Sequence, residues 1–203
     1  LLERLDDVLE WPVDWFPNGG ATLSERLGCP VDGAVPRPVA LRLAALLHRL
    51  STGEASEAGR RLKLSREMVE LLQAVTGYFR GGCSLPPEPA GRPAVLFLWG
   101  ASPWEPEVIL LAAASIAATM PEADTPALGD ALGPAREMMA LWAGRATRGV
   151  PPLPLDGAVL MDELGLSPGP LLGRVLREAR LAWEAGEAST REDVLTVARE
   201  VLG

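Results

Sequence analysis

The sequence of 203 residues is poor in the side chains that carry out most enzyme chemistry. It contains one histidine, two cysteines and one tyrosine. Because His48 is the only imidazole, catalysis by a nucleophile, a histidine and a carboxylate would depend on that single residue. We interpret His48 as a packed or hydrogen-bonded histidine, since it lies in the most apolar predicted helix.

Cysteine pairs and long apolar runs are missing as well. Cys29 and Cys83 lie far apart without a C-x-x-C motif, so we expect two free, buried thiols rather than a disulfide or a zinc ribbon. The longest uncharged apolar run, Val108 to Met120, is too short to span a bilayer. The chain begins without methionine or a targeting signal, and we expect a part of a longer cytoplasmic protein.

Positive charge is the minority charge. The chain has 19 Lys and Arg residues against 27 Asp and Glu residues, which gives a net charge of −8. Such a balance argues against a surface that binds polyanions throughout, so any contact with nucleic acid requires a local basic patch. The apolar content of 48% is high enough for a buried core.

Most of the chain has the apolar period or the capping signals of helices, and no segment indicates a β-sheet. The predicted helices cover 2–10, a segment opened by Thr22-x-x-Glu25, 36–50, 54–62, a helix capped by Ser65, 102–120, one from 125, 135–148, 157–164, 168–185 and one opened by Ser189-x-x-Glu192. The sequence therefore predicts an all-α fold, an irregular multi-helix bundle followed by a small helical tail. Its predicted parts are a helical body over 1–81, its continuation over 82–150 and a tail over 151–203.

The predicted helix 36–50 carries an apolar stripe at helical spacing, from which we expect a largely buried helix. The stripe consists of Val39, Leu43, Leu46, Leu47 and Leu50. The end of this helix, Leu46-Leu47-His48-Arg49, resembles the segment of HD-type helical domains in which Leu-Leu-His-Asp supplies a metal-binding pair. Arg49 stands where that family has aspartate, and a guanidinium cannot bind a metal cation. The resemblance therefore implies a degenerate HD-like scaffold without metal.

The most specific motifs lie near the C-terminus. Residues 157–176 contain a Gly-x-x-Leu segment, the turn Leu-Gly-Leu-Ser-Pro-Gly-Pro and a Gly-x-x-Leu helix, and residues 186–192 read Gly-Glu-Ala-Ser-Thr-Arg-Glu. In this order they resemble the tail of bacterial class II tRNA nucleotidyltransferases (CCA-adding enzymes) and poly(A) polymerases. Residues 1–18 and Leu62-Lys-Leu-Ser65 resemble the same family more loosely.

The resemblance implies that this chain is the non-catalytic, RNA-binding C-terminal portion of such a protein. In that family a head domain adds the nucleotides and holds magnesium with an Asp-x-Asp motif, which this sequence lacks. We therefore expect no catalytic residue, metal or other cofactor in this chain. The implied partners are tRNA or another structured RNA and the protein's own head domain, and no membrane is expected.

Two basic groups are the candidate RNA-binding residues. Arg174, Arg177 and Arg180 recur every three residues on one side of a predicted helix. That helix is predicted to begin around Ser167 and Gly169, where free backbone N–H groups suit a phosphate. The second group crosses a helix end and a turn, and consists of Arg60, Arg61, Lys63 and Arg66.

Two other interpretations stay open at this point. The arginines can simply form solvated helix faces with Glu partners one turn away. The chain can also be a protein-interaction scaffold derived from an HD-like domain, which the net charge of −8 favours. Charge reversal in the 174–180 group separates the hypotheses, because only RNA binding depends on phosphate contacts.

Overall fold

The computed structural model describes residues 1–80, 85–120 and 125–202. Within these ranges the chain forms helices and no strand, so the predicted all-α fold is confirmed. Two compact units share the chain: unit 1 contains Leu1–Pro89 and Gly100–Arg148, and unit 2 contains Ala90–Trp99 and Gly149–Gly203. Among the described residues, no helix is long and apolar enough to cross a membrane.

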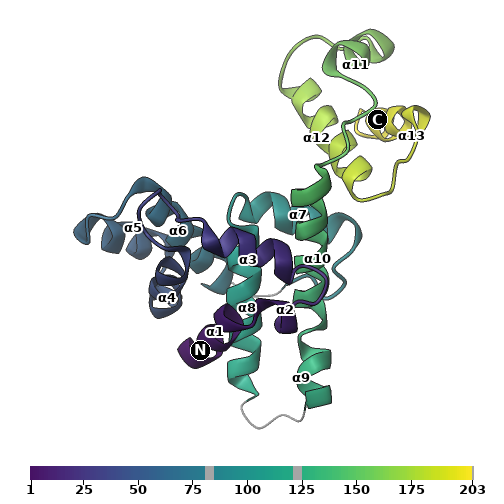
Figure 1. Ribbon diagram of the computed structural model, residues 1–203. Coiled ribbons are helices and arrows are strands. Elements are labelled where there is room, and N and C mark those ends of the chain that lie inside the picture. The colour runs from purple at the N-terminus through teal and green to yellow at the C-terminus, as the bar shows by residue number, and fades with distance from the viewer. Residues whose placement is uncertain (81–84, 121–124, 203) are drawn as a thin grey trace. The chain divides into compact units, whose positions relative to one another are not determined.

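Unit 1 is built around one helix that is apolar on all sides. Its helices are α1 (Leu2–Glu10), α2 (Pro12–Trp15), α3 (Gly20–Gly28), α4 (Arg37–Leu47), α5 (Thr52–Arg61), α6 (Arg66–Arg80), α8 (Glu105–Thr119), α9 (Thr125–Ala131) and α10 (Gly133–Arg148). Every residue of the segment 108–114 in α8 is buried, because α1, α4, α6 and α10 all pack against this helix. Figure 1 shows α8 and α10 running side by side.

Unit 2 combines the C-terminal helices with a segment from the middle of the sequence. Its helices are α11 (Gly157–Leu164), α12 (Pro170–Glu184), α13 (Arg191–Glu200) and most of α7 (Gly91–Ala101). The core contains Leu160 of α11, Val175 of α12 and Val194 of α13. The sequence places the boundary between body and tail at residue 151, with residues 90–99 in the body. In the structure residues 90–99 belong to unit 2.

Several predicted helix starts are wrong by one to three residues, among them those of α5 (54 instead of 52), α8 (102 instead of 105) and α10 (135 instead of 133). Helix α3 begins at Gly20, with Gly19 as its N-cap, and not at the Thr22 capping box. A Cβ on Gly20 would lie 2.4 Å from the Pro12 carbonyl oxygen, so this close approach to α2 requires glycine. Helix α12 begins two residues after Pro168, at Pro170. The capping box that opens α13 consists of Thr190 and Asp193, whereas the sequence predicts Ser189 and Glu192.

The apolar stripe predicted for α4 faces the wrong way. Val39 is 51% and Leu46 is 64% exposed, while the buried face carries small side chains such as Ala40 and Ala44. Leu41 is the large apolar residue buried on this face, and the alanines beside it let α4 approach α1, α6 and α8 closely.

The prediction of buried thiols is also wrong for Cys29, which is exposed and free. Cys29 lies just after α3, where its backbone is the C-cap of that helix. Cys83 lies outside the described residues.

Candidate nucleic-acid interface

A groove of about 730 Å³ lies within unit 2, where α7, α12 and the end of α13 meet. Basic, acidic and apolar side chains all line it: Arg92, Leu96, Arg174, Arg177, Glu178, Leu181, Glu200 and Val201. The groove therefore brings together Arg174 and Arg177, which the sequence predicts to contact RNA, and Arg92, which it does not.

Arg174 and Arg177 are the available cations of this groove. Both are exposed, and neither forms a hydrogen bond or an ion pair within the part of the chain that the structure describes. Their position follows from the pattern of α12, since Val175 and Ala179 on the other side of the helix are buried in the core. Two unpaired guanidinium groups are thus held at the surface by a packed helix.

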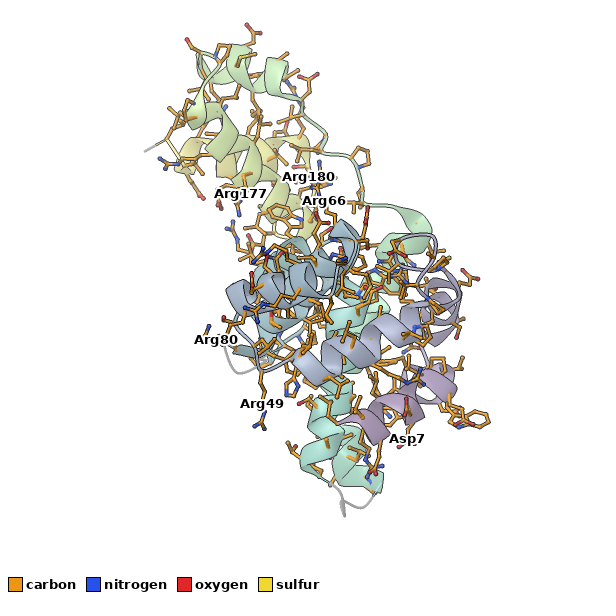
Figure 2. All side chains as sticks on the ribbon, turned by 90° about the vertical axis from the view of Figure 1, so that its left-hand side faces the viewer. Asp7, Arg49, Arg66, Arg80, Arg177 and Arg180 are labelled. Atoms are coloured by element: carbon orange, nitrogen blue, oxygen red, sulfur yellow. The ribbon has the colours of Figure 1, made fainter. Side chains whose placement is uncertain are left out.

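Arg180 differs from the other two members of the predicted row, although it lies only three residues after Arg177 (Figure 2). Its Nε donates a hydrogen bond of 2.8 Å to Oε1 of Glu184, whose side chain is 1% exposed. The other oxygen of Glu184 accepts a hydrogen bond of 3.0 Å from Nε1 of Trp99 in α7. Arg180 therefore supports the contact between α7 and α12 and does not line the groove.

Arg92 brings a third guanidinium into the groove, but with its charge already balanced. Its Nε donates to Glu187 at 2.7 Å and its Nη1 to Glu178 at 2.8 Å. The hydrogen bonds from Arg92 to Glu187 and Glu178 raise the pKa of Arg92 above its ordinary value. Sequence reasoning missed Arg92 because it lies in a Pro- and Gly-rich stretch that has the composition of a linker.

The predicted phosphate site at the start of α12 is not part of the groove. Gly169 is the N-cap of α12 with an extended backbone, and no side chain caps the helix. Ser167 is exposed two residues earlier. Neither residue is among those that line the groove.

The second predicted group lies in unit 1, at the turn between α5 and α6. Arg60 and Arg61 both pair with Glu57, and Arg66 pairs with Glu70. The hydrogen bonds from Arg60 and Arg61 lower the pKa of Glu57. Three of the four cations thus have carboxylate partners on their own helix.

Lys63 is the fourth member of that group and is exposed in the turn itself. Its backbone has φ of 55°, in the left-handed region. Figure 2 shows Arg66 and Arg80 at opposite ends of α6, so the basic group occupies only the end of α6 next to this turn.

Sequence reasoning missed the most buried charged cluster, which lies in unit 1. Oε1 of Glu107 accepts hydrogen bonds from Nη1 of Arg37 and, at 2.9 Å, from Nε of Arg26. The Trp104 ring faces both guanidinium groups at 5.7 and 5.8 Å. Glu107 and Arg37 are buried, and this desolvation lowers the pKa of Arg37. The cluster connects α3 and α4 to the start of α8.

His48 is hydrogen-bonded and packed rather than part of a site. Its Nδ1 lies 2.7 Å from the Ala45 carbonyl oxygen, and its ring packs edge-on against Phe79 at 5.4 Å. Over the described ranges no three His, Cys, Asp or Glu residues are grouped as a metal ion would require.

Comparison with known proteins found no match for this chain among protein-family models, curated proteins or solved structures.

Proposed function

We propose that this chain is the non-catalytic, RNA-binding C-terminal portion of a cytoplasmic protein resembling tRNA nucleotidyltransferases and poly(A) polymerases. In this proposal, unit 2 holds the sugar-phosphate backbone of tRNA or another structured RNA. The observation that carries it is the pair of guanidinium groups, Arg174 and Arg177, that share one groove of an acidic chain and have no partner in its described part.

The chemistry of this pair suits phosphate. A guanidinium presents a planar set of donors that matches two phosphate oxygens, and it stays charged at every physiological pH. Recognition of an A-form RNA helix depends on its shape, its phosphates and its 2′-hydroxyl groups rather than on base edges. The ordered tail motifs within unit 2 support the same assignment, because the resemblance concerns the residues that build α11, α12 and the start of α13.

A titration of labelled RNA tests the proposal. Fluorescence anisotropy would follow the binding of a tRNA minihelix at several salt concentrations. We expect R174E/R177E to bind at least tenfold more weakly and to lower the salt slope by about 1.5 to 2, because two phosphate contacts are lost. The matched control is R199E, which reverses an exposed arginine of α13 outside the groove.

Two results would contradict RNA binding in the groove. The first is the absence of binding by the unaltered chain at low salt. The second is an equal loss of affinity in R199E and in each single reversal of Arg174 or Arg177, because this would indicate a general charge effect.

A second candidate function is protein docking, which the exposed apolar residues near the N-terminus favour. Trp11 is 57% and Val13 is 52% exposed, next to each other at α2. A separately produced head domain of a tRNA nucleotidyltransferase serves as the probe. If unit 1 docks on it, W11S/V13S should weaken the complex in sedimentation without changing RNA affinity, and an unchanged complex would argue against this surface.

A further inference from the structure

The groove of unit 2 also contains a carboxylate that has no partner among residues 1–80, 85–120 and 125–202. Two acidic residues line it, and Glu178 is engaged by Arg92. Glu200, the last residue of α13, is exposed and forms neither a hydrogen bond nor an ion pair through its side chain within the described residues. Although Glu200 shares the groove with Arg174 and Arg177, it pairs with neither of them.

This arrangement restricts the kind of group that can occupy the groove. An ionised carboxylate only accepts hydrogen bonds, and an arginine only donates them. A ligand that satisfies both must therefore present an anionic acceptor and a hydroxyl or amine donor close together. Ribose-phosphate does so with its phosphate oxygens and its 2′-hydroxyl, whereas the DNA backbone has no donor. Against DNA, Glu200 would gain no hydrogen bond from the sugar and would repel the phosphates.

We infer that Glu200 is a specificity-determining residue that accepts a hydrogen bond from a ribose 2′-hydroxyl while Arg174 and Arg177 bind neighbouring phosphate oxygens. The groove then selects RNA over DNA through one carboxylate. This inference rests on the proposed RNA-binding function and adds to it the basis for recognising the sugar.

A hydrogen-bond acceptor and a simple negative charge at Glu200 predict different effects of its removal. If Glu200 were only a negative charge near the phosphates, its removal would strengthen the binding of RNA and DNA by the same factor. If it accepts from the 2′-hydroxyl, its removal lowers the preference for RNA over DNA. The ratio of the two affinities therefore separates a recognition role from simple repulsion.

The test compares E200A with the unaltered chain on an RNA hairpin, the DNA hairpin of the same sequence and the fully 2′-O-methylated RNA hairpin. Methylation removes the donor but keeps the A-form shape. We expect the unaltered chain to prefer RNA over both other hairpins, and E200A to lose about tenfold of this preference, as for one hydrogen bond to a charged acceptor. E192A, which removes an exposed carboxylate of α13 outside the groove, should keep the preference.

The outcomes distinguish a failure of Glu200 as the sugar-recognising residue from a failure of RNA binding by the groove. RNA binding with an unchanged ratio in E200A overturns the role of Glu200 and leaves the proposed function standing. Equal binding of RNA and 2′-O-methyl RNA by the unaltered chain also overturns it. No binding of RNA by the unaltered chain overturns the proposed function and the inference together. Circular dichroism of E200A verifies that α13 has kept its helix.

Discussion

The arginines of the buried cluster in unit 1 and those of the groove in unit 2 have different surroundings. In unit 1, Arg26 and Arg37 converge on the buried carboxylate of Glu107, and Arg136 donates to the Trp15 carbonyl oxygen at 2.9 Å. In unit 2, Arg174 and Arg177 have no partner among the described residues. The number of arginines in a segment is therefore a poor guide to RNA binding. An arginine is available to RNA only if its guanidinium is not already hydrogen-bonded to other residues of the protein.

The difference follows from how each unit builds its core. Helix α8 is buried on every side over residues 108–114, and Glu107 is buried directly before this segment, so its carboxylate must find partners inside the unit. The core of unit 2 takes one side of α12, which leaves the other side to solvent. An amphipathic helix at the surface can keep charges free, whereas a central helix cannot. The predictions below test this contrast in order of decreasing effect.

The largest effect is expected from breaking the buried cluster of unit 1. E107Q keeps the size of the side chain but leaves Arg37 buried without an anionic partner, which typically lowers the free energy of unfolding by about 3 kcal/mol or more. Urea denaturation followed by circular dichroism would measure it. E105Q, in the same turn of α8 but partly exposed, is the control and should change stability little. Equal stability of E107Q and the unaltered chain would show that the cluster is not structural.

A smaller effect is expected from Arg180, which contrasts with its neighbours on α12. R180A removes the hydrogen bond to Glu184, and we expect a loss of about 1 kcal/mol in the free energy of unfolding, because solvent screens the half-exposed guanidinium. The salt slope of RNA binding should stay unchanged. R177A should do the opposite, with a lower slope and unaltered stability. If R180A lowers the salt slope as R177A does, all three arginines of the row contact phosphate.

The pattern of Arg174, Arg177 and the buried Val175 shows what a single sequence can predict. Helical periodicity fixes which side of α12 faces the core, and it therefore predicts which arginines lie outside. The pairing of Arg180 with Glu184, one turn further along α12, fits the interpretation of helix faces with Glu partners, but the pattern cannot tell that Glu184 is buried and held by Trp99 from a distant segment. Partners far apart in the chain are set by tertiary packing.

Two features of unit 1 also show what helical periodicity cannot predict. In α4 both faces are apolar, so periodicity alone cannot decide which one packs, and the face with Ala40, Leu41 and Ala44 does. Glu107 looks like an ordinary acidic residue in the first turn of a helix, where the dipole favours it. A usable signal is its place directly before 108–114, a segment that is apolar on every side of the helix.

Acid should act on the two units in the same way, because each has a helix capped by a carboxylate. Backbone N–H groups of Ser51 and Ser189 donate to Glu54 and Asp193, and these hydrogen bonds lower the pKa of each carboxyl below its ordinary value of 4.5 or 3.8. Both caps therefore stabilise their helices at neutral pH. The stabilisation is lost as the pH falls below these ordinary values through the lower folded-state values.

Nuclear magnetic resonance would measure this loss. The amide proton shifts of Ser51 and Ser189 should change with midpoints below pH 4.5 and 3.8 respectively. D193N should abolish the transition at Ser189 and leave that at Ser51. A Ser189 transition at or above pH 3.8 would argue against the cap of α13.

The smallest effect on RNA binding is expected from the basic group of unit 1. R60A/R61A removes two cations that Glu57 already holds, so the salt slope should change by less than about 0.5, against about 1.5 in R174A/R177A. E57A provides the complementary experiment, because it releases both arginines without moving them to another surface. If this group lies within reach of the RNA, E57A should strengthen binding and steepen the salt slope, and R60A/R61A in the E57A background should cancel the gain. An equal loss of affinity in R60A/R61A and R174A/R177A would mean that pairing on the helix surface does not keep an arginine from phosphate, and the contrast between the two units would then fail.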